Sequence, residues 1–335
     1  METIKYRQRH LKTVSLFAGA GGLDLGFLNA GFDIIWANDF DKYAVQSYRA
    51  NVGDHIVEGD IANLWGEIPS HEVLIGGFPC QPFSMMGKQK GFEDERGTLF
   101  FNIQQILEKH NPNIIVLENV KGLENHDNGK TFEKMRNILE SDLGYKLFWK
   151  VLNTADFGIP QTRRRLFIVG FKNEFYESQH IEFTFPSAIN LEDRTVINLL
   201  DKTVDKRYFL SDRILPTILS SGTGKYYSRA EINLNIARPL CATMHKMHRA
   251  SQDNYYTDDI NRGKFEDTEE KRISNVRRLT PNECRKLQGF PSDWKQVVSD
   301  TQAYRQFGNA VTVDVAYNLA MSIVRSLNIE LDIEE

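Results

Sequence analysis

The sequence predicts an α/β protein built on a doubly wound, mostly parallel β-sheet, with a smaller and irregular second domain. Two observations predict the sheet. Short apolar runs alternate with segments of helical periodicity through the first half of the chain, and a glycine-rich stretch follows the first run. A third observation predicts the second domain, because this alternation stops near residue 186 and returns only near residue 272. We therefore expect one domain at residues 1–186 and 272–335 and another at 187–271.

The expected strands are short apolar runs bounded by turn residues, which suits strands that are covered on both faces. They are residues 13–17, 34–37, a run that ends before Gly59, 73–75, 114–117, 147–152 and 166–169. Between them, apolar residues recur at three- and four-residue intervals, which predicts helices. The helices are expected at residues 23–28, 43–50, 103–107 and 132–139, and later at 280–287 and 311–324.

The composition is that of a soluble globular protein, since 41% of the 335 residues are hydrophobic and 26% are charged. No apolar stretch approaches the roughly 20 residues that span a bilayer. The polar, basic N-terminus is also unlike a secretory signal. Three cysteines far apart in the chain argue against a disulfide framework. We therefore expect a cytoplasmic protein without membrane contact.

Charge is distributed unevenly along the chain. The whole sequence has a net charge of −4, which gives no indication of a nucleic-acid partner. Residues 194–249, in contrast, contain ten basic and four acidic residues. Such a segment is either an ordinary solvated face or a surface that binds a polyanion.

The glycine-rich stretch from Phe17 to Gly22 lies between an expected strand and an expected helix. Glycines let such a turn approach a ligand closely. A dinucleotide-binding fingerprint needs a third glycine where Asp24 stands, so a pyrophosphate is not indicated. Asp39 and Asp60 follow the next two strands, where carboxylates can accept from ribose hydroxyls and from an adenine amino group. The set fits an adenosine without phosphate, such as S-adenosylmethionine, and a tight turn without a ligand is the alternative.

Cys80 lies between Pro79 and Pro82, just after the fourth expected strand. Both prolines fix φ and lack an N–H donor, so they make the Cys-Gln turn rigid. Taken alone, such a cysteine is either a buried, inert thiol or a nucleophile. A polar loop with glycines at both ends follows at residues 87–97, and loops of this length are usually functional lids or disordered. A lid beside the thiol favours the nucleophile.

Six motifs, in order, resemble those of the bacterial cytosine-5 DNA methyltransferases of restriction-modification systems. The first three are Phe17-Ala-Gly-Ala-Gly-Gly, Pro79-Cys80-Gln81 and Glu118-Asn119-Val120. The others are Gln161-Thr-Arg163-Arg-Arg165, Arg278-Leu-Thr-Pro-Asn-Glu283 with Leu287-Gln-Gly-Phe-Pro291, and Gly308-Asn309-Ala310-Val311. Only residues 186–271 fall outside the resemblance, where that family has its variable target-recognition domain. The resemblance implies a Rossmann-like methyltransferase sheet and a DNA (cytosine-5)-methyltransferase.

The same resemblance implies roles for four catalytic residues. Cys80 would add to cytosine C6 as a thiolate, and Glu118 would hold the N3 and amino edge of the base. Arg165 would contact the cytosine O2, and Arg163 would help to position the glutamate and the closed loop. The target base would be flipped out of duplex DNA. The sequence does not identify the base that removes the C5 proton.

The resemblance further implies S-adenosyl-L-methionine as methyl donor, S-adenosyl-L-homocysteine as its product, and no metal. The expected cofactor-binding residues are Phe17, Ala18, Gly19, Ala20, Gly21, Asp39, Phe40, Asp60, Ile61, Pro79, Leu99, Asn309, Ala310 and Val311. The expected DNA-binding residues are Gln81, Ser84, Lys88, Lys90, Arg238, Thr243, His245, Lys246 and Arg249. For Lys88 and Lys90 a merely solvated loop is the alternative.

The segment from Arg238 to Arg249 also contains Cys241, His245 and His248, so zinc binding is an alternative there. Only three ligands are offered, and their spacing is not that of a finger or ribbon, so a loop that faces DNA is favoured. We expect a nucleoid-associated monomer that binds double-stranded DNA. A cognate restriction endonuclease would act on the same DNA site without forming a stable complex with this protein.

Two other functions are left open by the sequence. One is cytosine-5 methylation of transfer RNA, which would use the same chemistry. The other is DNA binding by an inactive scaffold. The basic segment at residues 194–249 favours DNA over transfer RNA, and the intact set of catalytic residues argues against a scaffold.

Overall fold

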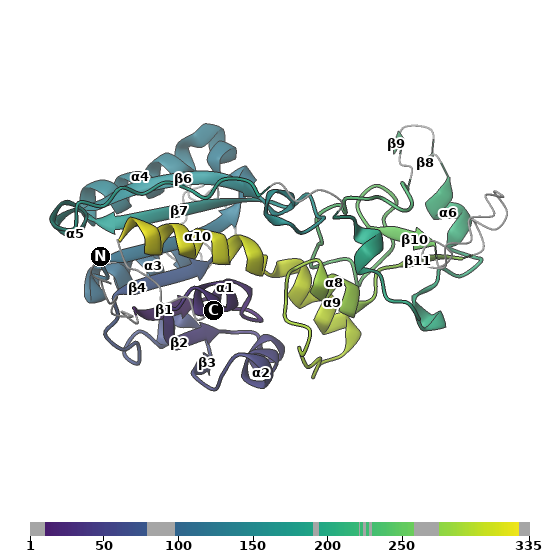
Figure 1. Cartoon of the computed structure of the whole chain (residues 1–335), viewed down its shortest axis with the longest axis horizontal. Helices are drawn as coiled ribbons and strands as arrows, with labels where there is room; N and C mark the ends of the chain where they lie inside the picture. The colour runs from purple at the N-terminus through teal and green to yellow at the C-terminus, as the bar shows by residue number, and fades with distance from the viewer. Residues whose placement is uncertain are drawn as a thin grey trace, which may run out of the picture. The chain divides into compact units, whose positions relative to one another are not determined.

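The computed structural model describes residues 11–78, 98–189, 194–220, 222–223, 226–227, 230–257 and 275–327. The chain divides into two compact units, both drawn in Figure 1. One comprises Met1–Leu152, Arg164–Ser187 and Val315–Glu335, and the other comprises Asn153–Arg163 and Ala188–Asp314. The second unit thus includes residues on both sides of the segment 187–271, whose status as a separate domain stays a prediction.

A seven-stranded sheet forms the framework of the first unit (Figure 1). The strands lie in the order β3-β2-β1-β4-β5-β7-β6. Neighbours from β3 through β5 are parallel, whereas β7 runs antiparallel to β5. The prediction of a doubly wound, mostly parallel sheet is therefore confirmed. The strands are β1 (Lys12–Leu16), β2 (Asp33–Asp39), β3 (Ile56–Glu58), β4 (Val73–Gly77), β5 (Ile114–Val120), β6 (Tyr145–Asn153) and β7 (Arg164–Lys172).

Helices form at the positions that the apolar periodicity predicts. Helices α1 and α2 extend one residue beyond the predicted range at each end, whereas α3 begins five residues earlier and ends three later. Helix α2 begins where the Asp41 carboxylate accepts from the Tyr43 N–H at 2.9 Å, as a helix cap does. Helix α4 continues into a single π turn at Ile138–Asp142. The helices of this unit are α1 (Gly22–Asn29), α2 (Lys42–Asn51), α3 (Thr98–His110), α4 (Lys130–Asn137), α5 (Asn173–Ser178) and α10 (Val313–Ser326).

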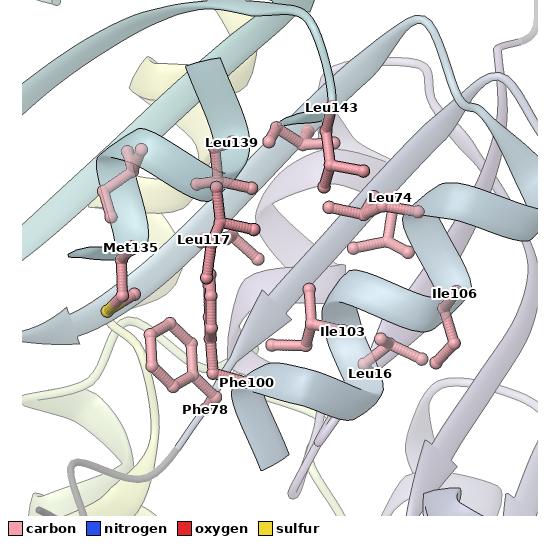
Figure 2. Packing of buried hydrophobic residues seen from close by; sticks show 14 of the residues in the cluster. Leu16, Leu74, Phe78, Phe100, Ile103, Ile106, Leu117, Met135, Leu139 and Leu143 are labelled. Carbon is pink, nitrogen blue, oxygen red and sulfur yellow. The ribbon is translucent and has the colours of Figure 1, made fainter. Parts of the chain in front are cut away.

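One face of the sheet is covered by α3 and α4, and the side chains between them form a large apolar core (Figure 2). Full burial of one such side chain stabilises the fold by about 1.5 to 3 kcal/mol. The cluster fixes β4 and β5, which lead into the predicted catalytic motifs. Its members include Leu16, Leu74, Ile103, Ile106, Leu117, Met135 and Leu139.

Helix α10 packs against α1, beside it in Figure 1. A Cβ atom added to Gly26 of α1 would collide with Ala316 of α10, so the two helices approach closely at that glycine. Leu319, Ala320 and Ile323 of α10 are also buried and recur at helical spacing. Residues of α1 and α10, far apart in the sequence, therefore pack against each other.

The second unit contains short elements joined by turns, as the irregular sequence predicts. Strand β10 (Tyr255–Thr257) pairs antiparallel with β11 (Val276–Arg278). Thr280 and Glu283 form a capping box at the start of α8, and Glu283 also pairs with the buried Arg277, with Nη2 and Oε1 2.8 Å apart. The remaining elements are β8 (Gly222–Thr223), β9 (Tyr226–Tyr227), α6 (Leu215–Leu219), α8 (Pro281–Lys286) and α9 (Asp300–Asn309).

In the part of the chain that the structure describes, every helix is too short or too polar to cross a bilayer.

Candidate active site

The predicted site residues of the first unit meet at one edge of its sheet. Leu16 at the end of β1 pairs with Gly76 of β4, and Gly77 pairs with Glu118 of β5. Because these strands are parallel, their carboxyl ends lie side by side, and open α/β sheets bind ligands at that edge. The glycine loop and the chain that leads into the cysteine loop (residues 79–97) leave the sheet there, and the glutamate motif ends β5 at the same edge.

The glycine loop, residues 17–22, is held by the end of β2. Phe17, Gly19 and Gly21 have φ of 57°, 59° and 89°, a region that glycine adopts readily and phenylalanine rarely does. The Gly19 N–H donates to Asp39 Oδ2 at 2.8 Å, and the Ala18 N–H donates to the Asn38 carbonyl at 2.9 Å. Asp39, expected to accept from a ribose, thus also anchors the loop.

Three further predicted cofactor residues follow β2 and β3, namely Phe40, Asp60 and the buried Ile61. Phe40 comes directly after Asp39, and 71% of its surface is exposed. The Gly59 N–H donates to the Asp39 carbonyl oxygen at 3.0 Å, which brings the end of β3 next to the end of β2. Asp60 is exposed and accepts from the Ala62 N–H at 3.0 Å. The structure therefore gathers an exposed aromatic ring and two carboxylates beside the glycine loop.

Two of the four predicted catalytic residues form an ion pair at the same edge. Arg165 Nε lies 3.0 Å from Glu118 Oε1, and only 21% and 10% of the two side chains are exposed. The antiparallel direction of β7 explains the contact. Arg165, near the start of β7, pairs with Val120 at the end of β5, and so lies at the carboxyl edge. The sequence predicted both residues, and the structure brings them together.

Asn119 is a site residue whose contact the sequence analysis did not foresee. Its amide Nδ2 donates to the Phe78 carbonyl oxygen at 3.0 Å, so β5 holds the chain just before the cysteine motif. Phe78 itself is buried, with its ring centroid 6.1 Å from that of Phe100. The predicted residues Pro79, Cys80, Gln81, Ser84, Lys88 and Lys90 lie outside the described residues. Leu99, also predicted, is half-buried in the first turn of α3 against the core.

Arg163 lies in the second unit and is almost fully buried. Its Nη1 donates to the Leu240 carbonyl at 2.8 Å, and its Nη2 donates to the carbonyls of Gly308 and Ala310 at 3.0 and 2.9 Å. Gln161 adds two bonds, since its Nε2 donates to the Leu287 carbonyl and its Oε1 accepts from the Leu240 N–H.

The Gln-x-Arg element therefore fastens three motifs of the second unit to one another. Its contacts reach the segment around residue 240, the late scaffold motif and the Gly-Asn-Ala-Val motif. Of the predicted cofactor residues there, Asn309 is exposed at the end of α9, whereas Ala310 and Val311 are buried. Their part in cofactor binding stays a prediction.

Residues 238–249, which we call the recognition loop, are held at both ends. Arg238 Nη2 lies 2.6 Å from Glu231 Oε2, and its N–H donates to Asn254 Oδ1 at 2.8 Å. Arg249 Nη2 lies 2.7 Å from Asp253 Oδ1. The two arginines predicted to bind DNA thus also fix the loop to its neighbours.

The middle of the recognition loop carries the more exposed side chains. Thr243 and Lys246, both predicted to bind DNA, are exposed, and 63% of the Met247 surface is exposed as well. His245 Nδ1 lies 2.8 Å from the Ala242 carbonyl oxygen. Across the described ranges, no three His, Cys, Asp or Glu side chains are grouped so that they could hold a metal ion.

Comparison with known proteins identifies the family. Residues 11–325 match the family model described as C-5 cytosine-specific DNA methylase. The chain belongs to this family. It is a DNA cytosine-5 methyltransferase, as its motifs predict.

Curated relatives and solved structures agree with this assignment. The methyltransferase is 40% identical to the Type II methyltransferase M.SsoII of Shigella sonnei over 95% of this chain and 81% of the relative. It is 35% identical to the Type II methyltransferase M.HhaI of Haemophilus parahaemolyticus, over 95% of each chain. The crystal structure of S. pombe Dnmt2 methyltransferase shares its fold, with a TM-score of 0.76 at 22% identity over 95% of this chain and 99% of the other.

Proposed function

We propose that this methyltransferase flips a cytosine out of duplex DNA and methylates C5 through covalent addition of Cys80 to C6. The ion pair between Glu118 and Arg165 is the observation that carries the proposal. It lies one strand from Gly77, three residues before Cys80 in the sequence. A carboxylate and a guanidinium next to the strand that leads to Cys80 match the needs of a cytosine that must be held, polarised and attacked.

One Glu118 oxygen would accept from the exocyclic amino group, and the other would share a proton with N3 of the cytosine. Arg165 would donate to O2, where negative charge develops as the thiolate adds. A fixed donor at a developing charge is among the strongest forms of catalytic stabilisation. Their mutual bond at 3.0 Å supports this arrangement, because each side chain orients the other before the base enters.

S-adenosyl-L-methionine fits the cluster of residues beside β1, β2 and β3. The Asp39 carboxylate suits ribose hydroxyls, the exposed Phe40 ring suits stacking on adenine, and Asp60 suits the adenine amino group. Asp24 in place of the third glycine argues against a pyrophosphate. When bound, the ligand supplies a methyl group on a cationic sulfonium.

The proposed chemistry balances on the residues of this chain and the two substrates. The Cys80 thiolate forms a bond to C6, and the electron pair of the C5–C6 double bond becomes nucleophilic at C5. C5 then takes the methyl group. A base removes the C5 proton, the double bond re-forms, and the thiolate leaves. Arg163, buried among main-chain carbonyls, acts in this proposal as a positioning residue and does not touch the base.

DNA binding would involve both the cysteine loop and the recognition loop. Extracting a base from the stack requires a few kcal/mol, which contacts to the opened duplex can offset. The exposed Thr243, Lys246 and Met247 are suited to meet DNA, together with the predicted Gln81, Ser84, Lys88, Lys90, Arg238, His245 and Arg249.

We also infer a place in restriction-modification. The relatives named above are Type II methyltransferases. Methylation by this chain would protect DNA from an endonuclease that acts on the same site, without a stable complex between the two proteins. A monomer is sufficient for this role, because the proposed site is built from one chain.

Cys80→Ser provides the most direct test of the mechanism. We expect loss of methyl transfer from labelled S-adenosyl-L-methionine to DNA, with binding of the ligand unchanged in calorimetry. The wild-type protein should form a covalent adduct with duplex DNA that carries 5-fluorocytosine at the target position, because fluorine cannot leave as a proton does. Substantial turnover by Cys80→Ser would refute the nucleophile. Methyl incorporation only into transfer RNA would refute the DNA substrate.

A further inference from the structure

A buried carboxylate lies in the first turn after the glycine loop. Asp24 has no exposed surface. Its Oδ1 accepts from the Ser15 hydroxyl at 2.7 Å, and its Oδ2 accepts from the Tyr48 hydroxyl at 2.7 Å. These bonds join β1, α1 and α2. Both donors are neutral hydroxyls, so the hydrogen bonds bring no compensating positive charge.

Tyr48 also supports the glycine loop directly. A Cβ atom added to Gly21 would lie 3.1 Å from the Tyr48 ring and 2.9 Å from Val52 Cγ2, so the loop backbone packs against α2. Gly19 is bonded to Asp39 in the same loop. The glycine loop therefore has two carboxylates close by. Asp39 accepts a hydrogen bond from its Gly19 N–H, and Asp24 follows the loop by two residues in the chain.

The protons of this network can be assigned from its donors. The Tyr48 hydroxyl has one hydrogen, which it gives to Asp24, so His55 Nε2, 2.9 Å away, must donate to the Tyr48 oxygen. Burial lowers the pKa of His55, which favours its neutral form, and burial raises the pKa of Tyr48, which keeps its proton. The charges that face this network are thus Asp24 itself and Asp39, with Asp33 and Asp54 acting on His55.

Burial and the nearby carboxylate of Asp39 both raise the pKa of Asp24. The bonds from Tyr48 and Ser15 lower it, so that the pKa is about 6. The ligand-free protein therefore holds its Asp24 charge at a penalty, which a nearby cation would relieve.

This inference rests on the proposed cofactor. We propose that Asp24 determines ligand specificity at the glycine loop, because its buried charge favours the cationic S-adenosyl-L-methionine over the neutral thioether S-adenosyl-L-homocysteine. The N-terminus of α1 carries a partial positive charge that alone would disfavour a sulfonium. A carboxylate in its first turn reverses that preference, and a charge in a dry site acts over several ångströms. Once the methyl group has left, the attraction ends and the product dissociates more readily.

Calorimetry with both ligands tests the proposal through the ratio of their dissociation constants. Asp24→Asn is expected to weaken S-adenosyl-L-methionine binding roughly tenfold at about pH 7.5 and S-adenosyl-L-homocysteine binding less than twofold. The new amide can keep both hydrogen bonds, since its oxygen accepts from Ser15 and its N–H can donate to the Tyr48 oxygen. The Tyr48 hydroxyl would then donate to His55 Nε2.

Tyr48→Phe is the matched control. It keeps the ring against Gly21 but removes the hydroxyl bond that lowers the pKa of Asp24. This control is therefore measured at about pH 9, where Asp24 keeps its charge, and there it should weaken both ligands equally and leave their ratio unchanged. The wild-type protein offers a test without any substitution. A cation lowers the pKa of Asp24 on binding, so the affinity for S-adenosyl-L-methionine relative to the product should fall about threefold between about pH 7.5 and 5.5, as Asp24 takes up its proton.

An unchanged ratio in Asp24→Asn, or a wild-type ratio that is the same at both pH values, would overturn the role of Asp24. Failure of the wild-type protein to bind either ligand would instead refute the proposed cofactor, and circular dichroism of each variant separates both results from misfolding.

Discussion

Arg163 and Arg165 stand two residues apart in one motif and have opposite surroundings. Arg165 is partly exposed at the edge of the sheet and pairs with the carboxylate of Glu118. Arg163 is buried and donates to three main-chain carbonyls. A charge that is left partly solvated can respond to a substrate, whereas one that is enclosed by carbonyls fixes the backbone around it. Two arginines of one motif can therefore have different roles, one suited to contact a substrate and one that holds the backbone in place.

The largest expected effect is on the methylation rate, which should depend strongly on Arg165. Arg165→Ala should lower kcat by roughly a hundredfold to a thousandfold, as the loss of one donor at a developing charge does. Its free energy of unfolding should fall by about 1 to 2 kcal/mol, because the buried Glu118 loses this partner while Arg165 itself is partly exposed. Single-turnover methylation and urea denaturation measure the two quantities. A large loss of stability with near-normal turnover would reverse the assignment.

Arg163→Lys tests the architectural half. A lysine ammonium cannot reproduce the fork that reaches Leu240, Gly308 and Ala310, so buried carbonyls lose their donors. The free energy of unfolding should fall by about 2 to 3 kcal/mol. Arg165→Lys is the matched control and should cost under about 1 kcal/mol. Equal losses in the two lysine variants would show that the surroundings do not distinguish the arginines.

Asp24 is a third charged residue for this comparison. It is buried like Arg163, and its hydrogen-bond donors are neutral hydroxyls. Its pKa is raised to about 6, so the carboxyl is easier to keep protonated in the folded protein than in the unfolded chain. The resulting stability is present below about pH 4 and is lost as the pH rises through about 6. Asp24→Asn should therefore be more stable than wild type by about 3 kcal/mol at pH 8, with most of the difference gone at pH 4. Urea titrations at both values measure it, and a constant difference would contradict the assignment.

Gly308→Ala gives the smallest expected effect. Its new Cβ would run into the backbone of Cys241 and Ala242, next to the carbonyls that Arg163 binds. We expect a loss of about 1 to 2 kcal/mol, since this backbone can yield only in part. Gly66→Ala is the matched control, because a Cβ there would meet nothing within 4 Å. Thermal unfolding that does not distinguish the two variants would mean that the segment is less tightly fastened than the contacts indicate.

The sequence predicted the sheet from local patterns and Glu118 and Arg165 as site residues from their motifs, but it did not predict the ion pair between them. Apolar runs define the parallel strands, and the motif at the end of β5 places Glu118 at their carboxyl edge. The partners of Arg163 could not be predicted, since Leu240, Gly308 and Ala310 lie 77, 145 and 147 residues away in the chain. Contacts of that kind arise from tertiary packing and leave no periodic signal.

Two other features escaped prediction for more local reasons. Helix α9 buries only a few residues, among them Ala303, Tyr304 and Phe307, too short an apolar pattern to separate from a loop. The Asp24 network was missed because a lone Asp, Ser, Tyr or His is unremarkable in sequence. Only the fold brings these four side chains from β1, α1, α2 and the turn after α2 into one chain of hydrogen bonds.

The contact between Gly26 and Ala316 has a consequence during synthesis on the ribosome. The strands of the sheet are complete by Lys172, but the helix that packs against α1 is made 144 residues later. At about 5 to 20 residues per second, that interval lasts roughly 7 to 30 seconds. Throughout it, the nascent sheet would keep an uncovered apolar surface. Helix α10 thus completes packing that α1 begins, and the first unit can become fully native only after Ser326 has been made.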